Sequence, residues 1–436
     1  MRFIKPSFKI LKGYYRNPAV NLKLVLANEL DKIKRDDRQA VTRVVYGVVR
    51  KERLLDYIIQ TVSKRKLKKI QPDIRLLLRM GVFLLIYSQS YPDYAVVNEV
   101  VDAVAGKAKG FVNALLRNII KRKKTIIETI ENSDQLDLKY SVSRLLIDNL
   151  PNISDNIEEH LEYLNREPLF HIRVNTGEGN YSEAKQLLTE NQVAFRELEK
   201  FCSFEIKETG AVINRLLEKK QFYFQNTASQ LVSIIASKFS KQAVLDCCAA
   251  PGTKSVTLSL LNPDLTVYAN DINPKRAKLL KDFLTGYHLT AIKPVVSDIK
   301  NICFKKDFDF IIVDASCTSS GTLRKNPDLK LKIDNDLVSK NAKEQHEIME
   351  TLMNYFSNTG SDVYILYSVC SFIKAETEDI MEKVLKIDNV ETVDLEALLE
   401  EYGFNYKKGD YGYYLLPNDT LNNDMFYLVL FRCAAL

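Results

Sequence analysis

The chain has 436 residues, 46% of them hydrophobic and 27% charged, which excludes a disordered or fibrous protein. At roughly 100–200 residues per domain, this length accommodates about two to four domains. The densest apolar run, residues 76–87, contains Arg79 and is too short to span a bilayer, and the N-terminus lacks the apolar stretch of a signal peptide. Seven cysteines without CxxC spacing and four scattered histidines disfavour a disulfide scaffold and a metal site. We therefore expect a cytoplasmic protein with no bound metal and no membrane association.

The net charge of +6 hides an asymmetry along the chain. Residues 1–130 carry 28 lysines and arginines against 11 acidic residues, a balance of +17, whereas the rest of the chain has a balance of −11. A basic region joined to an acidic one indicates that the basic region meets a polyanion. The alternative is a solvated basic surface that has no partner.

Residues 17 to about 122 show the apolar spacing of successive helices. Apolar residues recur every three or four positions between Val41 and Ile59, Pro72 opens a helix that ends before Pro92, and the spacing resumes at Val96. We expect a compact all-α domain over residues 1–130, with basic loops at 63–69 and 121–124. Residues 131–220 mix one strand (169–176), one helix and further short strands, which predicts a small α+β connector.

From residue 221 to residue 436, strands and helices alternate. This order predicts an α/β domain with a doubly wound, mostly parallel, Rossmann-like sheet. Ligands of such sheets bind at the carboxyl ends of the strands. The expected strands are residues 243–247, 265–270, 292–297, 308–314, 362–368 and 425–433.

Polar or small residues follow the first three of these strands. Asp246 ends the first, and the turn Ala249 to Gly252 leads from it into a helix, so that backbone N–H groups can approach a ligand. This turn is neither a GxGxxG fingerprint nor a Walker A loop. Asp271 is placed to accept the hydroxyls of a ribose, or else to cap the next helix. Asp298 is placed to bind an adenine amino group, or else to cap a loop.

Two cysteines follow the next two strands. Asp314-Ala-Ser-Cys317 and Tyr367-Ser-Val-Cys370 fall at the same edge of the predicted sheet. Two thiols beside a carboxylate indicate covalent catalysis, because a thiolate is a good nucleophile near neutral pH. The alternative, a cysteine packed as a small hydrophobe, is our interpretation for Cys202, Cys303 and Cys433. A disulfide between Cys317 and Cys370 is disfavoured in a reducing compartment.

These motifs together resemble the RNA cytosine-C5 methyltransferases of the NOL/NOP/Sun family, and within it the bacterial 16S ribosomal RNA enzymes of the RsmB (Sun) type. RQAVTRVVYGVVRKERLLDYII, LLLRMGVFLLIYSQSYPDYAVVNEVVDAV and KGFVNALLR resemble the NusB-like RNA-binding domain of that type, and FHIRVNT resembles the start of its connector. DCCAAPGTKS, DINPKR, FDFIIVDASCTSSGTLRKNPDLK and YSVCS resemble the methyltransferase motifs, in the same order.

The resemblance implies a methyl donor, S-adenosylmethionine, and a ribosomal RNA substrate in a single-stranded or loop region, because the target base must leave its stack. It implies that Cys370 is the nucleophile, that Cys317 assists release, and that Asp314 lies near both donor and base. We also expect RNA contact by the connector and a monomeric chain. The residues implied to line the donor site are Cys248, Ala249, Ala250, Pro251, Gly252, Thr253, Lys254, Asp271, Asp298 and Asp314.

The chain departs from the family pattern at four places. Ser316 replaces the usual proline before Cys317, Val369 replaces the usual threonine before Cys370, Thr253 replaces a glycine, and the stretch 424–427 reads Asp-Met-Phe-Tyr. Both cysteines, Asp314 and Lys254 remain, so we expect an active enzyme. The alternatives are a methyltransferase acting on transfer RNA or 23S ribosomal RNA, and a catalytically weak RNA-binding ribosome-assembly factor.

Overall fold

A computed structural model describes the chain from residue 1 to residue 433, except residues 178, 288, 302–307, 360–361 and 387–389. The chain forms two units. The first comprises residues 1–148, 157–165 and 323–332, and the second comprises residues 149–156, 166–322 and 333–436. No helix in the described ranges is both long and apolar enough to cross a membrane.

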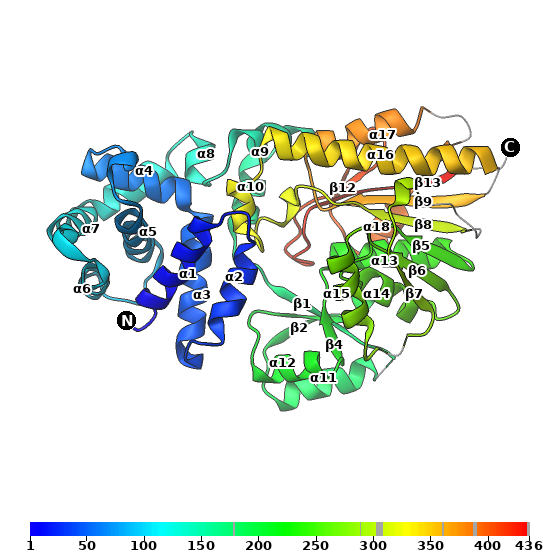
Figure 1. Cartoon of the computed structure of the whole chain (residues 1–436), viewed down its shortest axis with the longest axis horizontal. Coiled ribbons are helices and arrows are strands. Elements are labelled where there is room, and N and C mark those ends of the chain that lie inside the picture. The colour runs from blue at the N-terminus through cyan, green and yellow to red at the C-terminus, as the bar shows by residue number, and fades with distance from the viewer. Residues whose placement is uncertain (178, 288, 302–307, 360–361, 387–389, 434–436) are drawn as a thin grey trace. The chain divides into compact units, whose positions relative to one another are not determined.

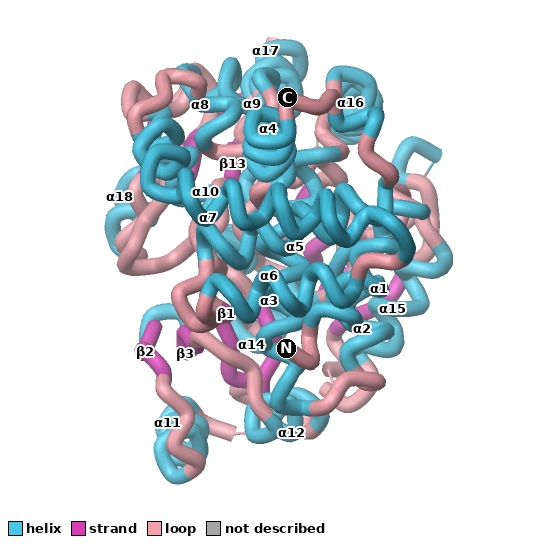
Figure 2. Tube along the Cα trace, turned by 90° about the vertical axis from the view of Figure 1, so that its left-hand side faces the viewer, coloured by secondary structure: helices cyan, strands magenta, loops and turns pink. Residues whose placement is uncertain are grey.

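The first unit is built from helices, as the sequence predicts (Figure 2). Its apolar spacing produces one buried core, in which Val45, Leu55, Leu78, Val100 and Leu116 are fully buried. Its α-helices are α1 (Ile4–Arg16), α2 (Leu22–Leu30), α3 (Arg35–Arg50), α4 (Glu52–Ser63), α5 (Pro72–Tyr87), α6 (Asp93–Ala103), α7 (Lys109–Glu131), α8 (Leu136–Lys139), α9 (Arg144–Asn149) and α10 (Ile157–Asn165).

One expectation about this unit is wrong. Residues 121–124, expected in a loop, lie inside α7, which continues to Glu131. Ile119, Ile126 and Ile130 pack into or against the core at helical spacing, so the helix buries its apolar side and exposes its basic one. The other basic segment, residues 63–69, lies close to this helix, because the Arg65 guanidinium lies 4.7 Å from the centre of the Phe111 ring.

The first unit also contains residues 323–332, a segment from the middle of the α/β part of the sequence. Its Lys330 is 3% exposed and donates to the Arg50 carbonyl, the Tyr140 carbonyl and Asn165 Oδ1 at 3.3, 3.1 and 2.7 Å. Burial lowers the pKa of this ammonium well below its usual range. The packing of this segment with the helices was not predicted from the sequence.

The second unit begins with a small antiparallel sheet in the order β2-β3-β1-β4. Its strands are β1 (Phe170–Val174), β2 (Phe195–Leu198), β3 (Ser203–Ile206) and β4 (Phe222–Phe224), with helices α11 (Tyr181–Glu190) and α12 (Ala211–Glu218). Ile172, Phe204 and Phe222 pack with these helices on one face. On the other face, Arg173 and Ser203 bond to Gln230 of α13 (Thr227–Phe239), so both faces of this sheet are occupied.

Among the described residues, the larger sheet has nine strands. Its core is mostly parallel, as predicted. Its order is β11-β12-β13-β9-β8-β5-β6-β7, with β10 also paired to β13. Strands β7, β6, β5, β8 and β9 are parallel, and β13 is antiparallel to β9. The strands are β5 (Ala243–Asp246), β6 (Thr266–Asn270), β7 (Ile292–Val295), β8 (Phe310–Asp314), β9 (Val363–Val369), β10 (Val390–Val393), β11 (Tyr406–Lys408), β12 (Tyr413–Leu415) and β13 (Phe426–Cys433).

Helices cover the larger sheet. Figure 1 shows α16 and α17 along one face, and α14 and α15 toward the other. Val232 of α13 and Val256 of α14 share a core with Val244, Phe310 and Leu366 of the central strands. The chain order of strands reverses between β5 and β8, which is where such sheets bind their ligands. The helices are α14 (Thr253–Leu261), α15 (Pro274–Leu284), α16 (Asn335–Thr359), α17 (Glu378–Val384) and α18 (Glu396–Glu401).

Candidate active site

The turn after β5 brings backbone close to the edge of the sheet. Gly252 has a φ of +110°, and a Cβ there would lie 2.6 Å from Leu280 Cδ1, so both conformation and space require glycine. Thr253 opens α14 directly after it, which leaves N-terminal N–H groups of that helix available to a ligand. Ala249 and Gly252 are buried, Cys248 and Ala250 are half-buried, and Pro251 is exposed. This small-residue turn fits the approach of a polar ligand.

Asp271 directly follows β6, and one of its two carboxylate oxygens accepts no hydrogen bond from the described residues. Its Oδ1 accepts from the Asn273 N–H at 2.9 Å, whereas buried Oδ2 accepts no hydrogen bond among the described residues. Oδ2 has an ion pair of 3.3 Å with the half-exposed Arg276, which also donates to the Ala250 carbonyl. The cap of α15 is Asn273 and not Asp271, so the capping alternative does not account for Asp271. A buried carboxylate oxygen beside the small-residue turn fits a hydroxyl-bearing ligand.

Both carboxylate oxygens of Asp298 accept hydrogen bonds from residues close to it in the sequence. Its Oδ1 accepts from the Lys300 N–H at 3.0 Å, and its Oδ2 accepts from Asn301 Nδ2 at 3.2 Å. Both contacts shape the turn after β7. The capping alternative is therefore realised for Asp298, and any contact with a ligand would share these oxygens.

Lys254 and Asp314 form an ion pair at the centre of the site. Lys254 Nζ lies 2.6 Å from Asp314 Oδ2, and Ser368 Oγ donates to Asp314 Oδ1 at 2.9 Å. Burial lowers the pKa of Lys254, but the adjacent Asp314 carboxylate outweighs burial and the pKa is raised. Lys254 therefore stays charged, and its ion pair with Asp314 links the turn after β5 to the ends of β8 and β9.

The two cysteines meet at these strand ends. Cys317 Sγ lies 3.4 Å from Cys370 Sγ, and Ser319 Oγ lies 3.3 Å from Cys370 Sγ. The Cys370 contact, followed by burial, raises the pKa of the Cys317 thiol well above its usual range. The fold thus holds the protonated Cys317 thiol directly beside the Cys370 sulfur atom.

The backbone around Cys317 is restrained even though Ser316 replaces a proline. Gln345 of α16 donates to the Ser316 carbonyl at 2.8 Å. Ser319 has a φ of +57°, an uncommon conformation for a residue with a side chain. Gly321 packs so closely that a Cβ would lie 2.0 Å from the Met425 carbonyl oxygen, and its N–H donates to the Cys370 carbonyl at 3.0 Å.

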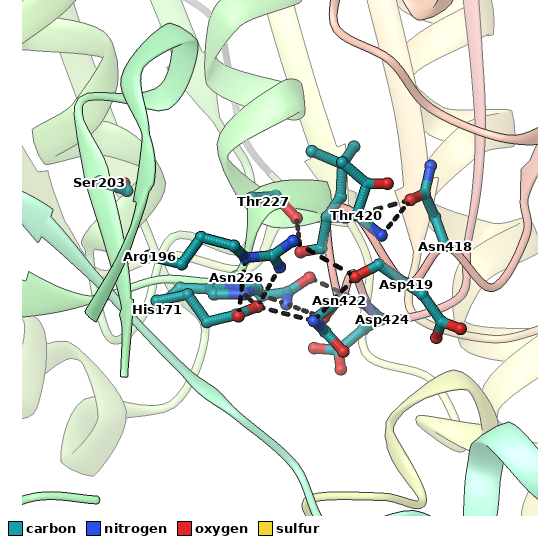
Figure 3. Close-up of polar contacts among 12 residues, drawn as sticks. His171, Arg196, Ser203, Asn226, Thr227, Asn418, Asp419, Thr420, Asn422 and Asp424 are labelled. Atoms are coloured by element: carbon teal, nitrogen blue, oxygen red, sulfur yellow. Dashed lines mark hydrogen bonds and ion pairs between the residues drawn. The ribbon is translucent and has the colours of Figure 1, made fainter. Parts of the chain in front are cut away.

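A polar network around Asn226 and Asn422 was not predicted from the sequence (Figure 3). Asn226 Oδ1 caps α13 and also accepts from the Asp424 N–H at 2.8 Å, while Asn226 Nδ2 contacts His171 Nδ1 at 3.0 Å. Asn422 Nδ2 donates to Glu205 Oε2 at 2.7 Å. The network joins the small sheet to the loop 418–424, and the Met425 N–H that follows this loop donates to the Gly321 carbonyl. Spacing alone could not reveal it, since its members are up to about 250 residues apart.

A buried carboxylate, Glu376, was also missed. It accepts hydrogen bonds from the residues that follow the two thiols, Thr318 and Ser371. Of the other cysteines, Cys433 is buried and Cys202 half-buried, while Cys303 lies outside the described residues. Across the described part of the chain, no group of three or more histidine, cysteine or acidic side chains is arranged to hold a metal ion.

The mostly parallel sheet, with its ligand edge at the switch point between β5 and β8, is that of a Rossmann-like methyltransferase domain. The family model "16S rRNA methyltransferase RsmB/F" matches residues 232–432, and the NusB family model matches residues 5–121. Residues 232–432 are therefore similar to the RsmB/F family of S-adenosylmethionine-dependent RNA cytosine methyltransferases, and residues 5–121 are similar to the NusB family.

Named relatives match over nearly the whole chain. A probable ribosomal RNA small subunit methyltransferase B from Coxiella burnetii is 26% identical over 95% of this chain and 97% of its own. Ribosomal RNA small subunit methyltransferase B from Pasteurella multocida is 24% identical over 94% and 92%. Among solved structures, PH0851 superposes with a TM-score of 0.75 at 22% identity, covering 98% of this chain and 97% of that one. NSun6 from Pyrococcus horikoshii with SFG gives 0.56 at 14% identity, covering 67% and 99%. PH0851 shares the fold of nearly the whole chain, and NSun6 that of about two thirds of it.

Proposed function

We propose that this chain transfers a methyl group from S-adenosylmethionine to C5 of a cytosine in 16S ribosomal RNA, through a covalent bond between Cys370 and C6 of the base. The observation that carries the proposal is the 3.4 Å separation of the Cys317 and Cys370 sulfur atoms, directly after the strand ends where Ser368 donates to Asp314. The choice of 16S RNA is supported by the names of the relatives from Coxiella burnetii and Pasteurella multocida.

The reaction accounts for two thiols. Cytosine C5 is a poor nucleophile, and addition of the Cys370 thiolate to C6 moves electron density onto C5, which then takes the methyl group. In this proposal, Asp314 hydrogen-bonds the N3 side of the base and favours this addition. Methyl transfer leaves S-adenosylhomocysteine. A base then takes the proton from C5, and the electron pair of that C–H bond re-forms the 5,6 double bond and expels the Cys370 thiolate from C6. Cys317 assists this release.

The donor is proposed to bind over the turn after β5 and to supply an electrophilic methyl group. Asp271 Oδ2 offers an acceptor for the ribose hydroxyls, and Arg276 must shift or share that oxygen. Asp298 is assigned to the adenine amino group as a weaker contact, because its oxygens already serve the local turn. The remaining proposed donor contacts are Cys248, Ala249, Ala250, Pro251, Gly252, Thr253 and Lys254.

We assign three regions to this function: residues 1–130 to RNA docking, 131–220 to a connector that also contacts RNA, and 221–436 to catalysis. The basic balance of the first region favours a phosphate-rich partner. Phe170 of the connector and Phe224, which follows the connector on the same small sheet, are 38% and 41% exposed, with ring centres 5.9 Å apart, and offer an aromatic surface to an unstacked base. We further propose that the chain acts as a monomer.

The test uses the purified chain with labelled S-adenosylmethionine and, separately, 16S RNA, 23S RNA and transfer RNA. Bisulfite sequencing then maps each 5-methylcytosine. Label confined to 16S RNA supports the proposal, and label on another RNA corrects the substrate. A chain that binds RNA but shows no donor binding by calorimetry is the assembly factor instead.

A further inference from the structure

A buried carboxylate lies between the two backbone turns that carry the thiols. These are the Cys317 turn, residues 317–321, and the Cys370 turn, residues 370–373. Glu376 follows the second turn, at the end of the short 3₁₀ helix Lys374–Glu376, and its side chain is 0% exposed. Burying a carboxylate is costly unless hydrogen-bond donors surround it, so the groups that contact Glu376 are held firmly.

Residues of both turns donate hydrogen bonds to Glu376. The Thr318 N–H donates to Oε1 at 2.8 Å and the Thr318 hydroxyl to Oε2 at 2.6 Å. The Ser371 hydroxyl also donates to Oε2, at 2.6 Å. Thr318 directly follows Cys317, and Ser371 directly follows Cys370. One carboxylate therefore binds the residue after each thiol.

The other direct bonds between the turns are neutral. Ser320 Oγ lies 2.9 Å from Ser371 Oγ and accepts from the Phe372 N–H at 3.1 Å, and the Gly321 N–H donates to the Cys370 carbonyl. Hydrogen bonds to an ionised group are roughly twice as strong as neutral ones. Asn341 of α16 adds a fourth donor to Glu376 at 3.3 Å, which fixes the carboxylate from a separate element.

We infer that Glu376 is a positioning residue that holds the Cys317 and Cys370 sulfur atoms at 3.4 Å. It acts through Thr318 and Ser371 and touches no reacting atom. Its importance for catalysis rests on the proposed function, because both thiols must reach one base. The distance between the sulfur atoms can be tested without RNA or donor.

Phenylarsine oxide provides that test, since one arsenic atom forms bonds to two thiols only when both lie close together. The full-length chain is titrated with the arsenical, and Cys317→Ser gives the background from the other cysteines. Glu376→Ala should weaken the two-thiol complex about tenfold or more, the effect of losing a buried charge-assisted contact. The matched control is Glu378→Ala. Glu378 is also buried and accepts from the Tyr411 N–H, and among the described residues it has no hydrogen bond to either turn, so this variant should stay within about twofold of wild type.

Glu376→Gln tests whether the hydrogen bonds or the bulk of the side chain matter. Glutamine keeps the shape and one carbonyl acceptor, and the Thr318 and Ser371 hydroxyls can rotate to accept from its amide. Its affinity for the arsenical should fall between wild type and Glu376→Ala. If Glu376→Ala is folded and binds the arsenical as wild type does, Glu376 only stabilises the fold and the inference is wrong. If Glu376→Ala does not fold, the same comparison is made with Glu376→Gln and Glu376→Asp, and wild-type binding by both overturns the inference.

Kinetics separate this inference from the proposed function. In an active enzyme, Glu376→Ala should lower kcat about tenfold or more and leave the KM for S-adenosylmethionine within about twofold, because Asp271 and Lys254 are untouched. A wild-type chain that binds the arsenical but neither methylates RNA nor forms an adduct would refute the proposed function and leave the positioning result standing.

Discussion

Cys317 and Cys370 are separated by 53 residues in the sequence, yet their sulfur atoms lie 3.4 Å apart. Parallel pairing of β8 with β9 produces this contact, because Asp314 lies opposite Ser368 and each cysteine follows within three residues. The proximity makes the roles of the two thiols separable by mutation.

Substituting each cysteine should have a different effect on the covalent protein–RNA adduct. Cys317→Ala should methylate a base that it cannot release, so a protein–RNA adduct should accumulate on a denaturing gel. Cys370→Ala should form no adduct and no product, because the nucleophile is missing. If the adduct appears with Cys370→Ala and not with Cys317→Ala, the assigned roles are reversed.

The chemical reactivity of Cys317 should rise when Cys370 is removed. The contact with Cys370 is the largest cause of the raised pKa of Cys317, so Cys370→Ala should lower that pKa toward its ordinary value. Alkylation of the Cys317 peptide, followed by mass spectrometry from pH 6 to pH 10, should then begin at a lower pH. An unchanged profile would show that burial alone protects this thiol.

Asp271 should contribute strongly to donor binding. Removing a buried hydrogen-bonding carboxylate costs about 1.5–3 kcal/mol, or roughly 10- to 150-fold in affinity. Asp271→Ala should show this loss by calorimetry with S-adenosylmethionine, whereas Asp298→Ala should lose less because its oxygens already bond within the turn. Equal affinity for wild type and Asp271→Ala would remove Asp271 from the donor site.

Asp246 should make the fold less stable as the pH rises. Burial raises the pKa of this fully buried carboxyl to about 6, so between about pH 4 and pH 6 the folded state holds a proton that the unfolded chain has lost. The free energy of unfolding should therefore fall with pH across that window, by at most about 3 kcal/mol from this group.

Asp246→Asn is the matched variant for this effect. It keeps the shape of the side chain and can donate to the Ser255 hydroxyl, which now bonds to Asp246 Oδ2. Urea unfolding of both proteins from pH 4 to pH 8 should show a flatter pH dependence for Asp246→Asn. Parallel curves would assign the pH dependence to other groups.

The basic side of α7 should contribute to RNA affinity in a salt-dependent way. Reversing Arg122 and Lys124, both exposed, should weaken RNA binding and reduce the slope of log affinity against log salt, since each lost phosphate contact releases about one counterion fewer. Reversal of the exposed pair Lys383 and Lys386 is the control with the same charge change. Equal losses in both variants would mean that only net charge matters.

Local patterns predicted much of this structure. The strands around Asp246, Asn270 and Asp314 were predicted because apolar runs bounded by turn residues are characteristic of buried parallel strands. The candidate catalytic residues followed, since strand ends share one edge of the sheet. The hairpin of β11 and β12 was not predicted, because its three-residue strands are stabilised by pairing with the distant β13.

Glu376 shows why part of the site lies beyond such reasoning. In the sequence it is one acidic residue among several in KAETED, and that pattern is typical of an exposed segment. Its role depends on four donors from three separate parts of the chain. Asn226 and Asn422 were missed for a related reason, because amide side chains in loops show no periodic pattern in the sequence.

The segment 323–332 limits how this chain can be divided into fragments. A piece starting near residue 166 would carry the whole large sheet, but its Lys330 would lack the Arg50 and Tyr140 carbonyls and the Asn165 amide. A piece ending near residue 165 would in turn leave those three acceptors without their ammonium. Separate expression of the two halves should therefore yield poorly soluble products, whereas co-expression of both should recover a complex. Gene fusion or domain exchange in this chain would have to transfer residues 323–332 together with the helices.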